Sequence, residues 1–322
     1  MKKTAKAPAN IAFIKYWGKR DEKLRLPANS SISMNLSNAY TVTSVEFNKK
    51  YKSDSLFINH IRAGKDELIR VSNHLNLVRN ISKTGDFAKV ESKNNFPKGS
   101  GIASSASGFA ALTVAAASAA GLKLSEKDLS VLARLGSGSA CRSIPDGIVE
   151  WRYGSKSTDS YAHSLYPVGY WELYDVIAVA GKKNKKTSST EGHKATESSP
   201  FYKTRISGME KKIKDIKNAL KNRDFTQFGE VIEAEALNMH TVMMTSTPPL
   251  YYWMPKTLEI MQSVINWREK GLEVYFTIDA GPNVHIICQS KDVDSLREKL
   301  KEIKGFKNVI VNSISEGAHL VK

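Results

Sequence analysis

Glycine and serine residues crowd a loop that leads directly into a helix of small residues, between Asn95 and Gly121. Glycines let a backbone approach a ligand closely, and the free amides at the start of a helix favour an anion. The pattern therefore predicts a phosphate-binding loop, although it lacks the GxxxxGK[ST] order of a Walker loop. The alternative is a serine-capped helix whose alanines merely pack closely. The glycines are Gly99, Gly101 and Gly108, and the hydroxyls belong to Ser104, Ser105 and Ser107.

A second group of polar side chains follows a short apolar run near the start of the chain. Cationic and hydrogen-bonding side chains that are concentrated after one strand are typical of a site that binds an anion. The alternative is a strand end whose lysines are exposed to solvent. The group consists of Lys15, Tyr16, Trp17, Lys19, Arg20 and Asp21.

The segment GSGSACRS, residues 136–143, combines glycines, hydroxyls and one arginine. Arg142 could hold a carboxylate or phosphate through two parallel hydrogen bonds, a geometry that lysine lacks. The alternative is a tight turn with an arginine that faces solvent.

Two further segments place reactive groups in loops. Ser188, Ser189, Thr190 and Gly192 follow a run of lysines, so this loop is either a phosphate site or ordinary surface. Asp279 ends a predicted strand before a turn. A carboxylate in that position either satisfies turn amides or takes a proton from a substrate hydroxyl.

The composition predicts a folded protein. The chain has 322 residues, 41% hydrophobic and 25% charged, so two domains of ordinary size are expected. The longest early apolar run is too short for a signal peptide or a membrane span, and we expect a cytoplasmic location. Cys141 and Cys288 lack metal-ligand spacing, which argues against a disulfide framework and a zinc site.

The formal charge of +16 would suit nucleic acid, an anionic membrane or a polyanionic small substrate. The lysine runs are not interleaved with aromatic residues, and no nucleic-acid-binding signature is present. We therefore expect neither a nucleic-acid partner nor a membrane partner.

Periodicity predicts alternating helices and strands. Strands are expected at 41–47, 56–59, 88–92, 273–278, 284–288 and 309–313, and helices at 66–82, 105–120, 125–135, 225–239, 257–270 and 293–304. Spacings of three and four predict one amphipathic helix through Ile206, Met209, Ile213, Ile216 and Leu220.

This order predicts an α+β protein in which helices cover one face of a mostly antiparallel sheet. The stretch from Ser155 to Ser164 is polar and is expected to be a loop. A strand-like segment follows it, so we place the domain boundary near Glu172, which gives domains of 1–171 and 172–322.

Taken together, these segments resemble the diphosphomevalonate decarboxylases of the GHMP small-molecule kinase superfamily, and the resemblance runs along nearly the whole chain. It rests on NIAFIKYWGKRD (10–21), LPANSSIS (26–33), NNFPKGSGIASSASGFAAL (94–112), GSGSACRS (136–143), SSTEG (188–192) and DAGPN (279–283). The glycine-serine loop is typical of the superfamily, whereas the first and last strings are specific to the decarboxylases.

The resemblance implies a two-domain GHMP kinase-like fold, with an N-terminal domain like ribosomal protein S5 domain 2 and a C-terminal ferredoxin-like α/β sandwich. It also implies an ATP- and magnesium-dependent decarboxylation of mevalonate 5-diphosphate to isopentenyl diphosphate, which begins with phosphorylation of the 3-hydroxyl. Asp279 would orient or deprotonate that hydroxyl, Lys15 would stabilise charge beside it, and Arg142 would hold the substrate carboxylate. Relatives of this kind are often homodimers.

The same resemblance assigns two sets of binding residues. Magnesium would arrive with ATP and lie near Ser105. The diphosphomevalonate site would comprise Tyr16, Trp17, Gly18, Lys19, Arg70, Ser137, Gly138, Ser139, Ala140, Ser189 and Thr190. The ATP site would comprise Ser92, Asn94, Gly99, Ser100, Gly101, Ala103, Ser104, Ser105 and Ser107.

Several positions depart from the family pattern, namely Lys98 in the glycine loop, Pro145-Asp146 after GSGSACRS, and His193 after SSTEG. None removes a catalytic group, but they could reshape the pocket that distinguishes a 5-diphosphate from a 5-phosphate. A phosphomevalonate decarboxylase and a mevalonate 3-kinase therefore remain alternatives. So does a non-catalytic anion- or RNA-binding protein on the same scaffold.

Overall fold

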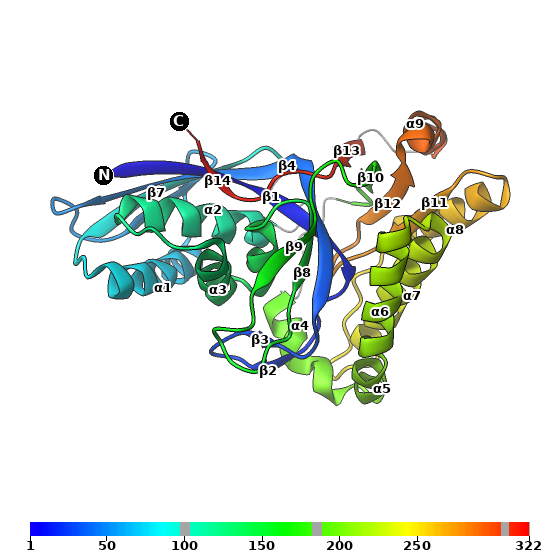
Figure 1. Cartoon of the computed structure of the whole chain (residues 1–322), viewed down its shortest axis with the longest axis horizontal. Helices are drawn as coiled ribbons and strands as arrows, with labels where there is room; N and C mark the ends of the chain where they lie inside the picture. Colours follow the sequence, from blue (N-terminus) through cyan, green and yellow to red (C-terminus); the bar gives the residue numbers. More distant parts are fainter. Residues whose placement is uncertain (97–103, 182–188, 304–308, 322) are drawn as a thin grey trace.

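The computed structural model describes residues 1–96, 104–181, 189–303 and 309–321, without the side chains of Ser189 and Thr190. Within these ranges the chain forms two main sheets that meet near the middle of the molecule (Figure 1). Helices pack against both of them, and both termini lie beside the larger sheet.

The larger sheet has eight strands in the order β14-β1-β4-β7-β5-β6, with β8 beside β4 and β9 beside β8. Every pairing is antiparallel except that of β5 with β7. The strands are β1 (Lys2–Ile14), β4 (Ser31–Asn48), β5 (Ser55–Ile58), β6 (Ile61–Arg62), β7 (Phe87–Asn94), β8 (Ile148–Trp151), β9 (Ala162–Tyr166) and β14 (His319–Val321).

The smaller sheet is antiparallel in the order β11-β12-β10-β13. A separate hairpin joins β2 (Lys19–Asp21) to β3 (Leu26–Pro27). The strands of the smaller sheet are β10 (Leu173–Ala178), β11 (Val274–Thr277), β12 (Val284–Gln289) and β13 (Val309–Ser313).

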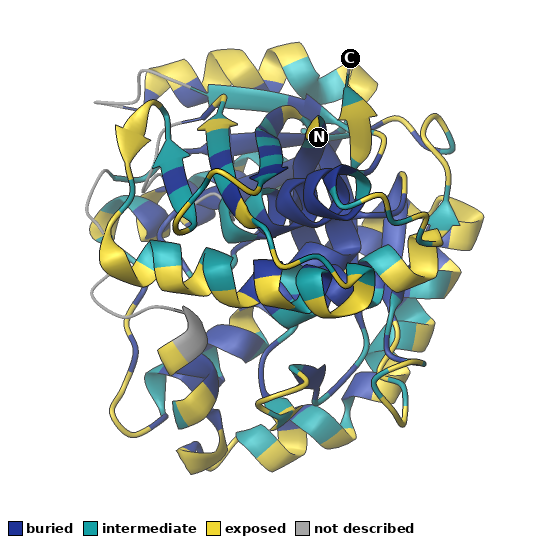
Figure 2. Ribbon diagram, turned by 90° about the vertical axis from the view of Figure 1, so that its left-hand side faces the viewer, coloured by how far each residue is buried: buried dark blue, intermediate teal, exposed yellow. Residues whose placement is uncertain are grey.

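The helices form two layers beside β1 and a third group behind the smaller sheet. The first layer contains α1 (Lys65–Ser82), α2 (Ser104–Ala119), α3 (Glu126–Gly136) and the 3-10 helix η1 (Gly138–Ser143). The second contains α4 (Ser189–Ala195), α5 (Tyr202–Ser207), α6 (Met209–Asn222) and α7 (Phe225–Met244). Helices α8 (Pro255–Glu269) and α9 (Val293–Glu302) cover the face of the smaller sheet opposite to α6 and α7. Figure 2 shows exposed residues on the outer sides of the surface helices and buried residues concentrated in the interior.

Helix α2 is buried on nearly all sides, because its alanines allow it to lie close to β1 and β4. A helix with this surface cannot stand in solvent, so the sheet fixes its position. Its N-terminus, which follows the glycine-serine loop, is fixed with it.

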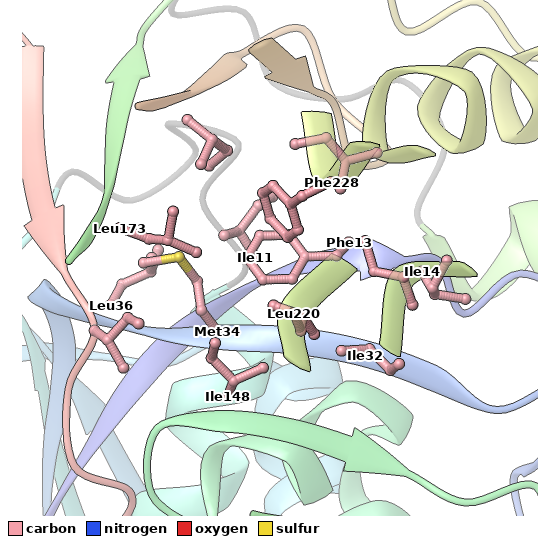
Figure 3. Close-up of a cluster of buried hydrophobic side chains, with 14 of the residues drawn as sticks. Ile11, Phe13, Ile14, Ile32, Met34, Leu36, Ile148, Leu173, Leu220 and Phe228 are labelled. Carbon is pink, nitrogen blue, oxygen red and sulfur yellow. The ribbon is translucent and has the colours of Figure 1, made fainter. Parts of the chain in front are cut away.

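Strand β1 links the two helical layers. Ala5 and Ala7 pack in the cluster that contains α1, α2 and α3, whereas Ile11 and Phe13 pack in the cluster that contains α6 and α7 (Figure 3). The register between β1 and β4 shifts between Pro8 and Asn10, where the strand redirects its side chains. The Phe13 ring meets Phe228 of α7 edge-on, with centroids 4.8 Å apart. The residues after β1 are thereby held between the two layers.

Most of the predicted elements are confirmed, and six predictions need correction. The segment expected to be a loop at 188–192 is helical from Ser189, where α4 begins. The strand expected at 41–47 is the second half of β4, which begins at Ser31. The amphipathic segment through Ile206 is two helices, because the chain turns at Gly208 between α5 and α6. The polar stretch ending at Ser164 is not all loop, since β9 begins at Ala162 and pairs with β8. The short apolar run near the start is the end of a 13-residue strand, whose earlier half is rich in lysine and alanine. The helix expected to reach Lys304 ends at Glu302.

In the described part of the chain, no helix is long and apolar enough to cross a membrane.

Candidate active site

An ion pair joins the end of β1 to the turn after β11. The Lys15 ammonium donates to Asp279 Oδ1 at 2.8 Å and to the carbonyl of Ala12 at 2.7 Å. Lys15 is 1% exposed, whereas the Asp279 side chain is 30% exposed. The carboxylate is therefore accessible to a ligand, and the buried lysine holds it in place through their hydrogen bond.

The surroundings favour ionised Asp279. Burial works to raise its pKa, but the Lys15 ammonium, with smaller contributions from His285 and Arg142, shifts the net pKa below the usual 3.8. Burial is also the largest influence on Lys15 and lowers the pKa of its ammonium below 10.5, while Asp279 opposes that shift. An ionised carboxylate beside an ammonium can accept a hydrogen bond from a hydroxyl and stabilise nearby negative charge.

A buried charge network fixes the backbone of Lys15. Its N–H donates to Glu235 Oε1 of α7 at 3.2 Å, and its carbonyl accepts from Asn29 at 3.0 Å. Glu235 and Arg205 are both essentially unexposed and form a bidentate pair, and Lys212 donates to the same carboxylate at 2.8 Å. The second helical layer therefore positions the end of β1 that leads into Lys15.

Arg142 is buried in η1 and is 3% exposed, so the alternative of an arginine facing solvent is wrong. Its guanidinium donates to three neutral acceptors, which are Ser33 Oγ at 3.1 Å, Ser31 Oγ at 2.8 Å and Asn10 Oδ1 at 3.1 Å. Among the described residues no carboxylate forms an ion pair with it. A buried cation held by neutral groups retains its charge for an anionic ligand.

Aromatic side chains follow Lys15 in the chain and pack against α4. His193 of α4 lies between Tyr16 and Trp17, with ring centroids 4.3 and 4.6 Å away. Its Nδ1 accepts a hydrogen bond from the N–H of Gly18 at 2.9 Å. Burial, followed by the charges of Lys19 and Arg25, holds the pKa of His193 well below 6.5, so the ring is neutral.

Close packing joins Tyr16 to the GSGS segment. A Cβ on Gly138 would lie 2.6 Å from the Tyr16 ring, so this position requires glycine. The hydroxyl of Tyr16 is buried without a partner among the described residues, and burial raises its pKa. Ser137 donates to Ser105 at 3.4 Å, which links this segment to the start of α2. The remaining predicted substrate residues of this group are Lys19, which pairs with Glu22 at 2.8 Å, and Ser139 and Ala140 of η1.

A cavity of about 160 Å³ adjoins the N-terminus of α2. Four of the predicted ATP residues line it, namely Ser92, Asn94, Ser104 and Ser105. Apolar side chains of β5, β7, α1 and α2 form much of the remaining wall, together with Thr43, Glu67 and Arg70. The first turn of α2 carries no acidic residue, so its amides and dipole favour an anion at the mouth of the cavity.

Ser107, predicted for the ATP site, and Arg70, predicted for the diphosphomevalonate site, lie in different surroundings from those that the predictions imply. Ser107 is fully buried and bonds Thr41 Oγ1 at 2.7 Å, so its hydroxyl faces the sheet. Arg70 lines the same cavity as Ser105 and lies over the Phe109 ring. Their roles in ATP and substrate binding stay predictions.

Some predicted positions lie outside the described residues. These are Gly99, Ser100, Gly101 and Ala103 of the loop, together with Lys98, and the side chains of Ser189 and Thr190.

Among the described residues, no group of three or more His, Cys, Asp or Glu side chains could hold a metal ion. Both cysteines are buried and free. A divalent cation would therefore depend on oxygen ligands supplied by a nucleotide and by hydroxyls such as that of Ser105.

Sequence reasoning missed the residues that position Lys15 and Arg142. Asn10, Ser31 and Ser33 lie inside two of the quoted strings, and their alternation on β1 and β4 was the available signal. Glu235 and Arg205 carried no signal, because they lie on helices that the sequence does not relate to Lys15.

Two family models match this chain. A family model described as the diphosphomevalonate decarboxylase-like N-terminal domain matches residues 7–162, and one described as the mevalonate 5-diphosphate decarboxylase C-terminal domain matches residues 175–319. The diphosphomevalonate decarboxylase of Debaryomyces hansenii is 36% identical over 313 residues, which cover 90% of this chain and 80% of that protein.

Solved structures are similar over the whole chain. A complex described as MDDEF with MVAPP, AMPPCP and magnesium has a TM-score of 0.95 and 41% identity, covering 100% of this chain and 99% of that one. A structure of the mevalonate diphosphate decarboxylase from Enterococcus faecalis has a TM-score of 0.93 and 40% identity, with the same coverage.

Proposed function

The chain belongs to the diphosphomevalonate decarboxylase family, and from that membership we propose that Asp279, Lys15 and Arg142 carry out its reaction. The reaction is the ATP-dependent decarboxylation of mevalonate 5-diphosphate to isopentenyl diphosphate, carbon dioxide, ADP and phosphate, in the mevalonate pathway of isoprenoid biosynthesis. One observation carries the assignment of residues. The accessible carboxylate of Asp279 and the buried ammonium of Lys15 lie 2.8 Å apart. The positive charge of buried Arg142 also lowers the pKa of both groups, and Arg142 has no carboxylate partner among the described residues.

The first step is transfer of the γ-phosphoryl group to the 3-hydroxyl of the substrate. Asp279 accepts the hydrogen bond of that hydroxyl and takes its proton as the oxygen attacks phosphorus, and the bond from phosphorus to the ADP oxygen breaks. Lys15 keeps Asp279 ionised before transfer and lies close enough to stabilise negative charge on the reacting oxygens.

The second step is loss of phosphate and carbon dioxide. The bond from C3 to the phosphate oxygen breaks, and the electrons of the bond between C1 and C2 form the double bond between C2 and C3. Arg142 holds the departing carboxylate, since its three described hydrogen bonds to neutral groups fix the guanidinium without neutralising it. Binding the substrate at both ends keeps the reacting bonds aligned.

The binding residues follow the same logic. Tyr16, Lys19 and Ser137 and their neighbours would hold the 5-diphosphate, and ATP would enter the cavity at the start of α2 with its phosphates toward Ser104 and Ser105. Magnesium would be held by the phosphates of ATP and the hydroxyl of Ser105, and it would offset the negative charge of the phosphate oxygens. A cavity that combines apolar walls with an N-terminus free of acidic side chains fits a nucleotide.

We also propose a cytoplasmic homodimer without nucleic-acid partners. The two buried free thiols support a reducing compartment, and the family resemblance supports the dimer. Light scattering on the purified chain tests the dimer, and a monomer at micromolar concentration would reject it.

Product analysis tests the function. The purified protein is incubated with magnesium and ATP, and mevalonate, its 5-phosphate or its 5-diphosphate is supplied separately. ADP and carbon dioxide should appear together and in equal amounts with the 5-diphosphate. The same pair from the 5-phosphate would assign a phosphomevalonate decarboxylase, ADP without carbon dioxide would assign a 3-kinase, and no reaction would reject catalysis.

A further inference from the structure

Arg25 is a cation that the mechanism above does not use. It ends the turn between β2 and β3 with a left-handed φ of 50°, and it is half-buried. Its Nε donates to the carbonyl of Leu135 at 2.9 Å. In the described ranges of the chain, no carboxylate lies within ion-pair distance of its guanidinium, and no partner is found for its two terminal amino groups.

Docking of the hairpin alone does not account for this side chain. Arg134 already ties the hairpin to the end of α3, because its Nε donates to the carbonyl of Leu24 at 3.1 Å. Arg134 is fully buried and also donates to Ser157 and Ser160. Arg25 contributes one bond to the same junction and retains its fork of two amino groups.

The position of Arg25 points toward the substrate site. Leu135, its anchor, immediately precedes the GSGS segment, and Gly138 of that segment packs against Tyr16. Burial lowers the pKa of His193, and the charges of Lys19 and Arg25 lower it further. Burial raises the pKa of Tyr16, and Arg25 is the strongest opposing influence. The charge of Arg25 therefore acts on the tyrosine and the histidine, and its anchor Leu135 lies three residues before Gly138, which packs against Tyr16.

Other cations lie close by. Burial lowers the pKa of Arg70, and the next largest cause is Arg25 itself, so the two guanidinium groups repel each other. Lys19 acts on the same histidine as Arg25. Lys19 is already paired with Glu22 at 2.8 Å, so Arg25 and Arg70 are the two cations that a ligand with more than one negative charge would stabilise.

We propose that Arg25 binds the terminal phosphate of the substrate's 5-diphosphate and sets the preference for a 5-diphosphate over a 5-phosphate. The inference rests on the proposed function, since it deepens the same site. Two parallel N–H groups match two phosphate oxygens, and the bond from Nε to Leu135 fixes the plane of the fork. A 5-phosphate lacks the second phosphate and would therefore not make this contact.

Binding measurements on the full chain test the proposal without requiring turnover. Dissociation constants for mevalonate 5-diphosphate and 5-phosphate are measured by calorimetry for the wild type, Arg25→Gln and Arg25→Lys. Arg25→Gln should raise the dissociation constant for the 5-diphosphate by roughly 10- to 100-fold, because charged hydrogen bonds are lost. The dissociation constant for the 5-phosphate should change by less than about threefold. The dissociation constant of Arg25→Lys for the 5-diphosphate should lie between those of the wild type and Arg25→Gln, because lysine keeps the charge but lacks the two parallel N–H groups.

Lys23→Ala is the matched control. Lys23 lies in the same turn, is exposed and forms no described contact, so both dissociation constants should match the wild type. Kinetics supply a second readout, in which Arg25→Gln raises KM for the 5-diphosphate and leaves kcat within about threefold.

Equal weakening of both ligands by Arg25→Gln would reduce Arg25 to a hairpin-docking residue and overturn the proposal. A rise confined to the KM for ATP would place the fork on the nucleotide and overturn it as well. A wild type that binds the 5-diphosphate without turning it over would refute the proposed function alone, since the binding ratio still decides the role of Arg25.

Discussion

Replacing Asp279 with asparagine is the most direct test of the mechanism. The change preserves the size of the side chain and an oxygen that can accept from Lys15, but it removes the negative charge and the basic group. Loss of a general base lowers rates by roughly 10²- to 10⁴-fold, so kcat should fall by about that factor. The nucleotide cavity does not include Asp279, so ATP affinity should stay within about twofold of the wild type.

The stability cost should be modest. Removing one partner of a fully buried ion pair costs about 3–5 kcal/mol. Asp279 is 30% exposed and asparagine still accepts a hydrogen bond, so the unfolding free energy should fall by about 2 kcal/mol. Asp294→Asn is the control, because that side chain is 93% exposed and both kcat and stability should be unchanged.

The assay combines release of ADP and carbon dioxide with titration of a nonhydrolysable ATP analogue and urea unfolding. A variant with wild-type kcat would refute the role of Asp279. Parallel losses of kcat, ATP affinity and more than about 5 kcal/mol of stability would instead mean that Asp279 holds the fold together.

The ion pair between Lys15 and Asp279 predicts how kcat/KM depends on pH. The pKa of Asp279 is below 3.8, so the carboxylate stays ionised at ordinary pH and the acid limb of kcat/KM should lie below pH 3.8. The pKa of Lys15 is below 10.5, so activity should be lost as pH rises through a value lower than 10.5. An acid limb between pH 5 and 7 that persists in Asp279→Asn would show that another group controls the rate.

Three further perturbations have defined outcomes. Gly138→Ala would place a Cβ 2.6 Å from the Tyr16 ring, so KM for mevalonate 5-diphosphate should rise about tenfold, and an unchanged KM would show that Tyr16 does not contact the substrate. Glu235→Gln leaves two cations without their carboxylate and should cost about 3–5 kcal/mol in urea unfolding, whereas Glu230→Gln on the exposed face of α7 should cost nothing. Burial, with a smaller contribution from Arg25, lowers the pKa of His74 from 6.5 to about 4, so its neutral form stabilises the fold above pH 6.5 and that stability is lost as pH falls toward 4. The loss should reach roughly 3 kcal/mol and should be absent in His74→Gln, and equal pH dependence of the two proteins would contradict it.

Local pattern was sufficient for much of the fold. Periodicity predicted α1, α3, α7, α8 and α9, since each repeats apolar residues at helical spacing. Helix α2 was predicted from its run of small residues before Gly121, because it is apolar on nearly all sides and has no such period. Strand β1 was recognised only at its end, because Ala5 and Ala7 are buried beneath helices and their small side chains resemble those of a loop. The break at Gly208 was missed because the apolar period continues across it.

The sequence by itself determined the family and named the residues proposed to react, because those residues lie in short strings whose order is specific. It could not determine that Lys15 and Asp279, 264 residues apart, form an ion pair, or that Arg142 is buried on neutral partners from two strands. Those facts depend on β1 passing between two helical layers, where residues distant in the chain meet in a low-dielectric interior. Burial and charge, which set pKa values and ligand preference, are properties of that packing. The case of Arg25 is the same: its sequence position resembles an ordinary turn, and only its tertiary neighbours indicate a phosphate.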